Sequence, residues 1–115
     1  MLDVTPLVAA VDSLADRLRS APQSRLQRGA ADEGLALARE LARRAHGIES
    51  PGAEPRPMPE VGMFAVADQV AVAGHDLAEA LRSASGAQPA APAPGGADLA
   101  DAVALVEAAA ERCGL

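Results

Sequence analysis

The strongest constraint in this sequence is a run of apolar residues between positions 59 and 84 that recur at alternating steps of three and four. That spacing keeps them on one side of an α-helix with about 3.6 residues per turn. The apolar row consists of Met63, Val66, Val70, Ala73, Leu77, Ala80 and Ala84. A second row, which we take as a candidate helix-packing surface, consists of the small residues Ala67, Ala71, Gly74 and Ala78. A helix with two such rows can be buried on two sides. We therefore expect it either to be central in the fold or to meet a partner.

The same reasoning predicts four helices in all, at residues 5–20, 22–46, 59–84 and 98–113. In the first, the Thr5 hydroxyl is expected to cap the helix, and Pro6 suits the first turn because its missing N–H is not needed there. In the second, Gly29 and Gly34 each cost about 1 kcal/mol relative to alanine. Either a neighbouring helix approaches closely there or the helix breaks near Gly29. Gly47 resembles a left-handed cap that ends this helix.

Two segments are expected to be flexible and non-helical. Residues 49–58 contain three prolines and a glycine, a composition typical of extended, polyproline-like chain. Such a strap can reach across one end of a bundle or along its flank. The next helix is expected to open with Pro59 and Glu60, a fixed φ and a negative charge at the positive end of the helix dipole. Residues 85–97 form a low-complexity linker of Ala, Pro and Gly.

Composition points to an all-α fold. The chain is 50% hydrophobic but 1% aromatic. Much of the apolar share is alanine, which is the easiest residue to place in a helix, whereas residues that favour strands are scarce. A length of 115 residues fits one domain. We therefore expect a single helical-bundle domain over residues 1–115, with four helices packed as an antiparallel up-down bundle.

Charge and cysteine content exclude several classes of function. A net charge of −6 argues against a general nucleic-acid binder, because such proteins gain affinity by neutralising phosphates. No apolar run is long enough to span a bilayer, and the N-terminal residues lack the basic region of a signal peptide. Cys113 is the single cysteine, so no internal disulfide is possible. These features predict a soluble cytoplasmic protein, and the exclusive use of arginine as the basic residue is typical of a high-GC bacterial genome.

One group of side chains invites a functional interpretation. Asp68, Val72, His75 and Glu79 lie on the side of the 59–84 helix opposite its core row and form a candidate ligand or partner surface. His75 and Glu79 are one helical turn apart and close enough to hydrogen-bond, whereas Asp68 is about 10 Å from His75 along the axis. In an antiparallel hairpin, Asp32 or Glu33 of the preceding helix would face His75 and could complete a metal or small-ligand site. The simpler interpretation is a solvated helix face.

His46 is a second candidate. The segment RRAHGIES resembles the histidine-phosphotransfer domains, which are four-helix bundles with an exposed histidine. In that family the histidine lies in mid-helix and is followed by a lysine and small residues. Here Gly47 follows directly and Glu49 occupies the place of the lysine, so an acid would lie beside a phosphorylated imidazole. The alternative is a histidine at a helix C-terminus, where it suits the dipole.

No enzyme motif is present. The chain has no Walker loop, no G-x-S-x-G elbow and no lysine or tyrosine for covalent chemistry. The segments SRLQRGAADEGLALARELARRA and VGMFAVADQVAVAGHDL resemble a family of small uncharacterised helical-bundle proteins from high-GC actinobacteria. That resemblance implies the helical fold and carries over no functional residue. We therefore expect a non-enzymatic protein without cofactor that acts by binding another protein, with a homodimer as the simplest form. Metal binding near His75 and phosphotransfer through His46 remain alternatives.

Overall fold

The computed structural model describes residues 2–54, 57–87 and 96–115, and within them every regular element is helical. Four helices build the fold: α1 (Thr5–Ser20), α3 (Ala31–Glu49), α4 (Val66–Ala87) and α5 (Gly96–Cys113). Short elements precede two of them, with α2 (Gln23–Arg25) and the π-helical turn η1 (Leu26–Ala30) leading into α3, and the 3₁₀ turn η2 (Met63–Ala65) leading into α4. The predicted all-α class is confirmed.

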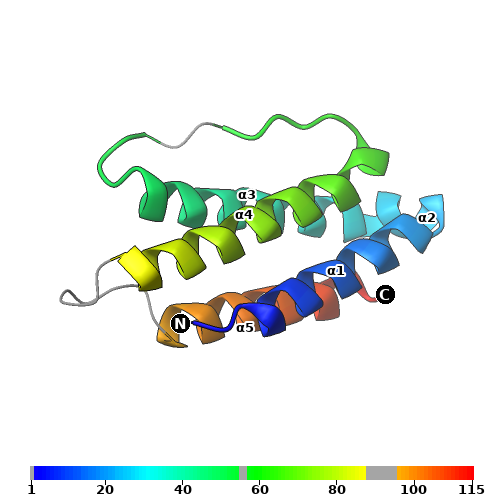
Figure 1. The fold of residues 1–115 in the computed structure, drawn as a ribbon. Coiled ribbons are helices and arrows are strands. Elements are labelled where there is room, and N and C mark those ends of the chain that lie inside the picture. Colours follow the sequence, from blue (N-terminus) through cyan, green and yellow to red (C-terminus); the bar gives the residue numbers. More distant parts are fainter. Residues whose placement is uncertain (1, 55–56, 88–95) are drawn as a thin grey trace.

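Helices α3 and α4 lie side by side and run in the same direction (Figure 1). Near their first turns, Gly34 of α3 packs against Val66 of α4. Near their last turns, Ile48 of α3 and Ala80 of α4 line the same cleft. The pair is therefore parallel, and the predicted antiparallel up-down order is wrong at this connection.

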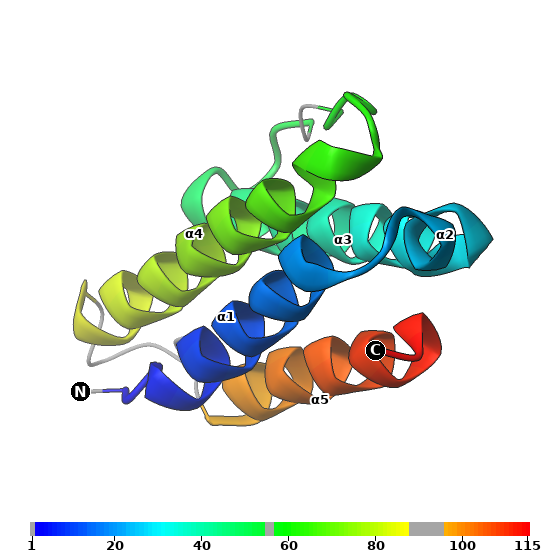
Figure 2. The same ribbon diagram turned by 90° about the vertical axis from the view of Figure 1, so that its right-hand side faces the viewer.

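The other neighbouring helices set the rest of the arrangement. α1 crosses α4 in the opposite direction, since Asp12 lies beside His75 and Arg19 lies beside Asp68. α5 runs opposite to α3, because ion pairs join Arg44 to Asp101 and Glu33 to Arg112. Figure 2 shows α1 between α4 and α5, with α3 behind them. The four helices thus form two parallel pairs, α1 with α5 and α3 with α4, and the two pairs run in opposite directions.

The strap at residues 50–62 makes the parallel arrangement possible. An extended chain of this length reaches about 40 Å at about 3.1 Å per residue, and the 19 residues of α3 span only about 28 Å. The described parts of the strap, residues 50–54 and 57–62, lie along the flank of the bundle, the second of the two paths considered from the sequence (Figure 1). Its described part is anchored where Arg39 Nε donates to the Met58 carbonyl at 3.1 Å and Gln69 Nε2 donates to the Pro59 carbonyl at 2.9 Å.

The predicted helix at 22–46 is broken at Gly29. Gly29 has φ of 131°, a left-handed conformation that side chains other than glycine rarely adopt, and it bends the chain between α2 and α3. Another helix approaches closely at Gly34. Both alternatives raised for these glycines are therefore observed, the break at Gly29 and the close approach at Gly34. The predicted stop at Gly47 is wrong, because α3 continues to Glu49, where Ser50 N donates to the His46 carbonyl at 2.8 Å.

Two helix starts differ from expectation. The third helix begins at η2 rather than at Pro59, because Gly62 turns the strap with φ of 104° and its N–H donates to Glu60 Oε1 at 3.1 Å. α1 covers the expected range 5–20, but Asp3 Oδ1 rather than the Thr5 hydroxyl accepts the first free amide, at 3.0 Å from Thr5 N. α5 begins at Gly96, two residues before the expected start. Most of the predicted linker, residues 88–95, lies outside the described residues.

The core is made of small and branched aliphatic side chains. Its largest fully buried members are Leu7, Leu14, Leu41, Leu77, Leu81, Val11, Val70 and Val106. Gly74 faces Val11, and a Cβ placed on this glycine would lie 2.5 Å from both methyl carbons of Val11. This glycine therefore sets how closely α1 and α4 approach. Among the described residues, no charged side chain is buried and no helix has the length and apolarity needed to cross a membrane.

Candidate functional site

The three polar residues predicted as a group on the third helix each have a different partner. Asp68 accepts from Arg19 Nη2 at 3.0 Å, and the same arginine also binds Asp16 at 3.1 Å. His75 Nε2 lies 2.7 Å from Asp12 Oδ1 of α1. His75 and Asp68 therefore join α4 to α1 along a half-exposed polar seam, and they are not brought together into one site.

Glu79 is bound within its own helix. Arg82 Nε donates to Glu79 Oε2 at 3.0 Å and Ser83 Oγ donates to Oε1 at 3.2 Å. The hydrogen bond from Arg82 holds the pKa of the Glu79 carboxyl below its usual value. The Glu79 carboxylate therefore hydrogen-bonds to Arg82 and Ser83, where the sequence had suggested His75.

The predicted metal site does not assemble. It required Asp32 or Glu33 opposite His75, but the parallel packing of α3 and α4 puts these acids beside the first turn of α4, about 14 Å along the helix axis from His75. Glu33 accepts from Arg112 Nε at 2.8 Å there. No group of three or more His, Cys, Asp or Glu side chains in the described part of the chain is arranged to hold a metal ion.

His46 and Gln69 each bury one polar atom without a hydrogen-bond partner. The atoms are His46 Nε2 and Gln69 Oε1, although Gln69 Nε2 is bound to the strap. A phosphotransfer histidine must present its imidazole nitrogen to another protein, and His46 Nε2 is covered. The geometry therefore gives no support to phosphotransfer through His46.

Cys113 is buried in α5 as a small core residue. Its Sγ lies 3.7 Å from the Ala30 carbonyl. Burial raises the pKa of the thiol, which keeps it protonated and unreactive.

The candidate packing surface of α4 is turned into the protein. Ala67, Gly74 and Ala78 are buried and Ala71 is half-buried. Gly74 meets Val11 of α1, while the main apolar row reaches α3, as in the contact between Val66 and Gly34. α4 is consequently covered by helices on two sides.

Three large hydrophobic side chains in the described part of the chain are exposed, and all three belong to η2, α4 and the turn before them. Val61 is 59% exposed, Phe64 73% and Val72 61%. Val72 belonged to the predicted surface, but Phe64 was not singled out from the sequence. Phe64 could have been identified from the sequence, because it is the single aromatic residue of the chain and lies just after a Gly that ends a proline-rich segment.

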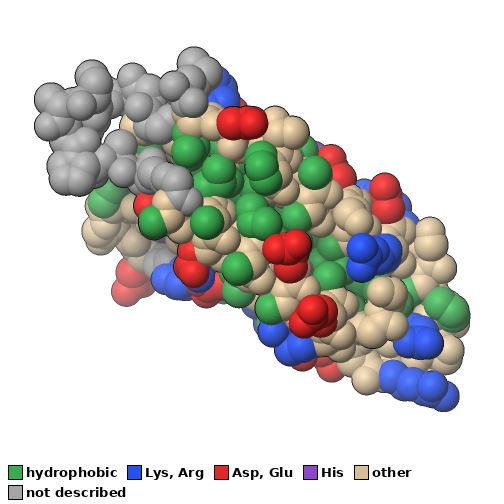
Figure 3. Space-filling view, turned by 90° about the horizontal axis from the view of Figure 1, so that it is seen from below, with side chains coloured by type: hydrophobic (Ala, Val, Ile, Leu, Met, Phe, Trp, Pro, Cys, Tyr) green, Lys and Arg blue, Asp and Glu red, His purple; other side chains and the backbone are tan. Residues whose placement is uncertain are grey.

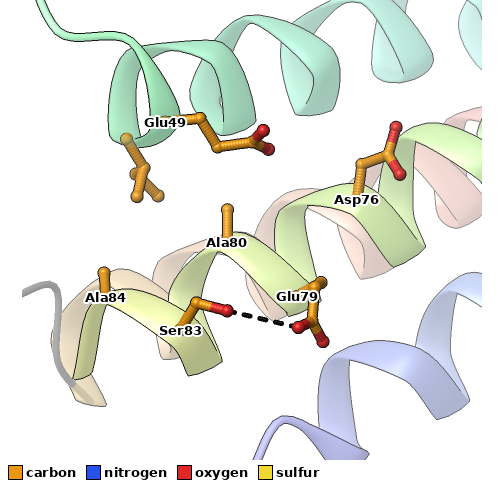
Figure 4. Close-up of a pocket in the computed structure, with 7 residues that line it drawn as sticks. Glu49, Asp76, Glu79, Ala80, Ser83 and Ala84 are labelled. Atoms are coloured by element: carbon orange, nitrogen blue, oxygen red, sulfur yellow. Dashed lines mark hydrogen bonds between the residues drawn. The ribbon is translucent and has the colours of Figure 1, made fainter. Parts of the chain in front are cut away.

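An open cleft of about 430 Å³ lies between the last turns of α3 and α4 (Figure 4). Ile48, Ala80 and Ala84 supply its apolar lining. Glu49 and Asp76 extend into the space between the two helices, whereas Glu79 points away from α3 (Figure 4). Neither Glu49 nor Asp76 has a hydrogen-bond or ion-pair partner among the described residues.

A second hollow, of about 380 Å³, lies at the opposite end, where η1 meets the C-terminus of α5. Its lining includes Arg25, Arg28 and Arg112 together with Asp32 and Glu33. Arg25 Nη1 donates to the Gly114 carbonyl at 2.7 Å and Arg112 binds Glu33, whereas Arg28 is exposed and has no partner among the described residues.

No protein-family model, curated protein or solved structure matches this chain. The resemblance to helical proteins of actinobacteria therefore stays a prediction, and any function must be argued from the geometry.

Proposed function

We propose that this chain is a non-enzymatic helical protein that works by binding another protein, with a second copy of itself as the first partner. The observation that carries the proposal is the exposure of Val61, Phe64 and Val72 along one segment. Single exposed apolar residues are common on protein surfaces. Three in one segment, including the only aromatic residue, are typical of a contact surface.

The geometry of the segment suits a symmetric dimer. Val72 is two helical turns beyond Phe64, about 12 Å along the axis, and about 80° around it. A twofold axis near this segment would place the same side chains of two copies against each other, so that each protomer covers the other's surface. Burying one side chain of this size contributes about 1.5–3 kcal/mol, and a dimer would bury six.

The remaining features fit an intracellular binding protein. Cys113 is a buried free thiol, which suits a reducing compartment such as the cytoplasm. The net charge of −6 disfavours binding to nucleic acid or to an anionic membrane. Neither feature identifies a partner, so the test starts with the chain alone.

Light scattering coupled to gel filtration tests self-association directly. We expect the wild-type chain to be at least dimeric at tens of micromolar, and the Phe64→Ser, Val72→Ser double variant to lose that association. Far-UV circular dichroism should not change, because both side chains are exposed. Ala104→Ser, at an exposed position of α5, is the matched control and should behave as wild type. A wild-type monomer at tens of micromolar would contradict self-association.

A further inference from the structure

The cleft between the last turns of α3 and α4 is negatively charged, and the parallel packing of these two helices is one cause. The last turns of α3 and α4 lie together, so the negative ends of two helix dipoles point to the same end of the bundle. The cleft at that end carries Glu49 and Asp76, two carboxylates without partners among the described residues. In an antiparallel pair the dipoles would oppose each other, and the cleft would be less negative.

The opposite end carries unpaired positive charge. Arg28 lies in the π-helical turn beside the bend at Gly29 and projects from the surface. Arg25 lines the same hollow, and one of its nitrogens donates a hydrogen bond at the end of α5. Figure 3 shows arginine side chains gathered at the right-hand end of the molecule, which is the α2 end in Figure 1.

The cleft suits both parts of an arginine side chain, the hydrocarbon stem and the guanidinium head. The hydrocarbon stem of an arginine covers apolar surface while its head remains polar, and Ile48, Ala80 and Ala84 supply apolar surface. The planar guanidinium binds carboxylates by paired, charge-assisted hydrogen bonds. Glu49 and Asp76 reach into the cleft from different helices and offer two carboxylates to a guanidinium.

We propose that a second copy of this chain docks head to tail, with Arg28 of one copy in the cleft between α3 and α4 of the next. The contact joins two different surfaces, so every copy keeps a free cleft at one end and a free Arg28 at the other. Such a heterologous contact continues into rings or open chains instead of stopping at two copies. The inference rests on the proposed self-association, but it uses residues other than Val61, Phe64 and Val72.

The experiment starts from the Phe64→Ser, Val72→Ser chain, in which the symmetric contact has been removed. A cleft variant adds Glu49→Lys and Asp76→Lys, and an arginine variant adds Arg28→Glu. Each altered side chain is exposed, so the helices should be retained, which circular dichroism can verify. A matched control adds Glu54→Lys and Glu107→Lys, which change the net charge as much as the cleft variant does but lie outside both surfaces.

Sedimentation velocity then measures assembly. Above the tens of micromolar at which the symmetric contact is tested, the starting chain and the control should form species larger than a dimer. Each single-surface variant should associate at least about 10-fold more weakly, as expected for reversing a close charge pair. An equimolar mixture of the cleft and arginine variants should regain assembly, with the two variants alternating, because the unaltered Arg28 and cleft are complementary and so are the two charge-reversed surfaces. A chain with all three charge reversals should regain assembly, because its charges are complementary again.

The results separate this inference from the proposed symmetric dimer. Variants that associate as well as the starting chain, or a mixture that stays monomeric, would overturn head-to-tail docking. The same changes can be made separately in the unmodified chain. If the Phe64 and Val72 changes abolish assembly and the charge reversals leave it unchanged, only the symmetric dimer is supported. If the Phe64 and Val72 changes leave assembly unchanged and the charge reversals abolish it, only head-to-tail docking is supported.

Discussion

Replacing Gly74 by alanine should destabilise the protein, although the same change ordinarily stabilises a helix. The added Cβ would lie 2.5 Å from both methyl carbons of Val11, which is 0% exposed and has no free space to move into. Overpacking of this kind costs about 1–3 kcal/mol, and the better helix propensity of alanine returns about 1 kcal/mol. With both methyl carbons of Val11 at 2.5 Å we expect a cost in the upper part of that range, about 2–3 kcal/mol, and therefore a net loss of about 1–2 kcal/mol in the free energy of unfolding.

Gly47 supplies the matched control. It also lies inside a helix, but a Cβ there would meet nothing within 4 Å. Gly47→Ala should therefore stabilise the protein by about 1 kcal/mol, the propensity gain alone. Because the chain has no Trp or Tyr, urea unfolding is best followed by far-UV circular dichroism.

A double-mutant cycle tests the cause. Val11→Ala should cost about 2 kcal/mol by itself, since it removes two buried methyl groups. In that background the Gly74 Cβ has room, so Gly74→Ala should become neutral or stabilising, and the two changes should be strongly non-additive. If Gly74→Ala stabilises the wild-type chain, or costs the same with and without Val11, then this glycine does not set the approach of α1 and α4.

Three further predictions concern single residues. His75→Ala should lower the free energy of unfolding by less than about 1 kcal/mol, because its contact with Asp12 lies at the surface. If urea unfolding shows a larger loss for His75→Ala than for Gly74→Ala, the packing argument is contradicted. Gly29→Ala should cost about 1–3 kcal/mol and shift the thermal midpoint down, because φ of 131° strains any side chain; an unchanged midpoint would show that the bend can relax. Hydrogen bonds from Arg43 and Arg44 lower the pKa of Glu40 from 4.5 to about 2. The stabilisation from Glu40 is therefore complete above pH 4.5 and is lost as pH falls towards 2, so Glu40→Gln should flatten the acid limb of a stability–pH curve.

The helices could be predicted from the sequence because each has an apolar row of its own. The range of α1 and the two buried sides of α4 follow from residues such as Leu7, Val11 and Gly74, whose spacing is local information. The ends of helices were harder to predict, because they depend on single backbone conformations. The sequence does not distinguish Gly47 from Gly62. In the structure Gly47 lies within α3, whereas Gly62 turns the strap before η2.

The direction of α4 could not be predicted, since the strap is long enough for either arrangement and both bury the same apolar rows. The candidate site depended on that direction. With α4 parallel to α3, His75 meets Asp12 of α1 instead of the acids of the second helix. Partners of this kind lie 63 residues apart in the chain and leave no periodic signal.

The parallel pair also affects the order in which the protein can fold. α1 and α3 follow each other in the chain, yet they meet mainly where Leu18 reaches Gly34, so they cannot form a helical hairpin. The partners of α1 are α4 and α5, and one of the bonds that close this end of the molecule joins Arg25 to Gly114 across 89 residues. Contacts of such long range slow folding relative to bundles with local pairing. During synthesis, α1 leaves the ribosome before α4 and must wait for α4 before it has a surface to bind.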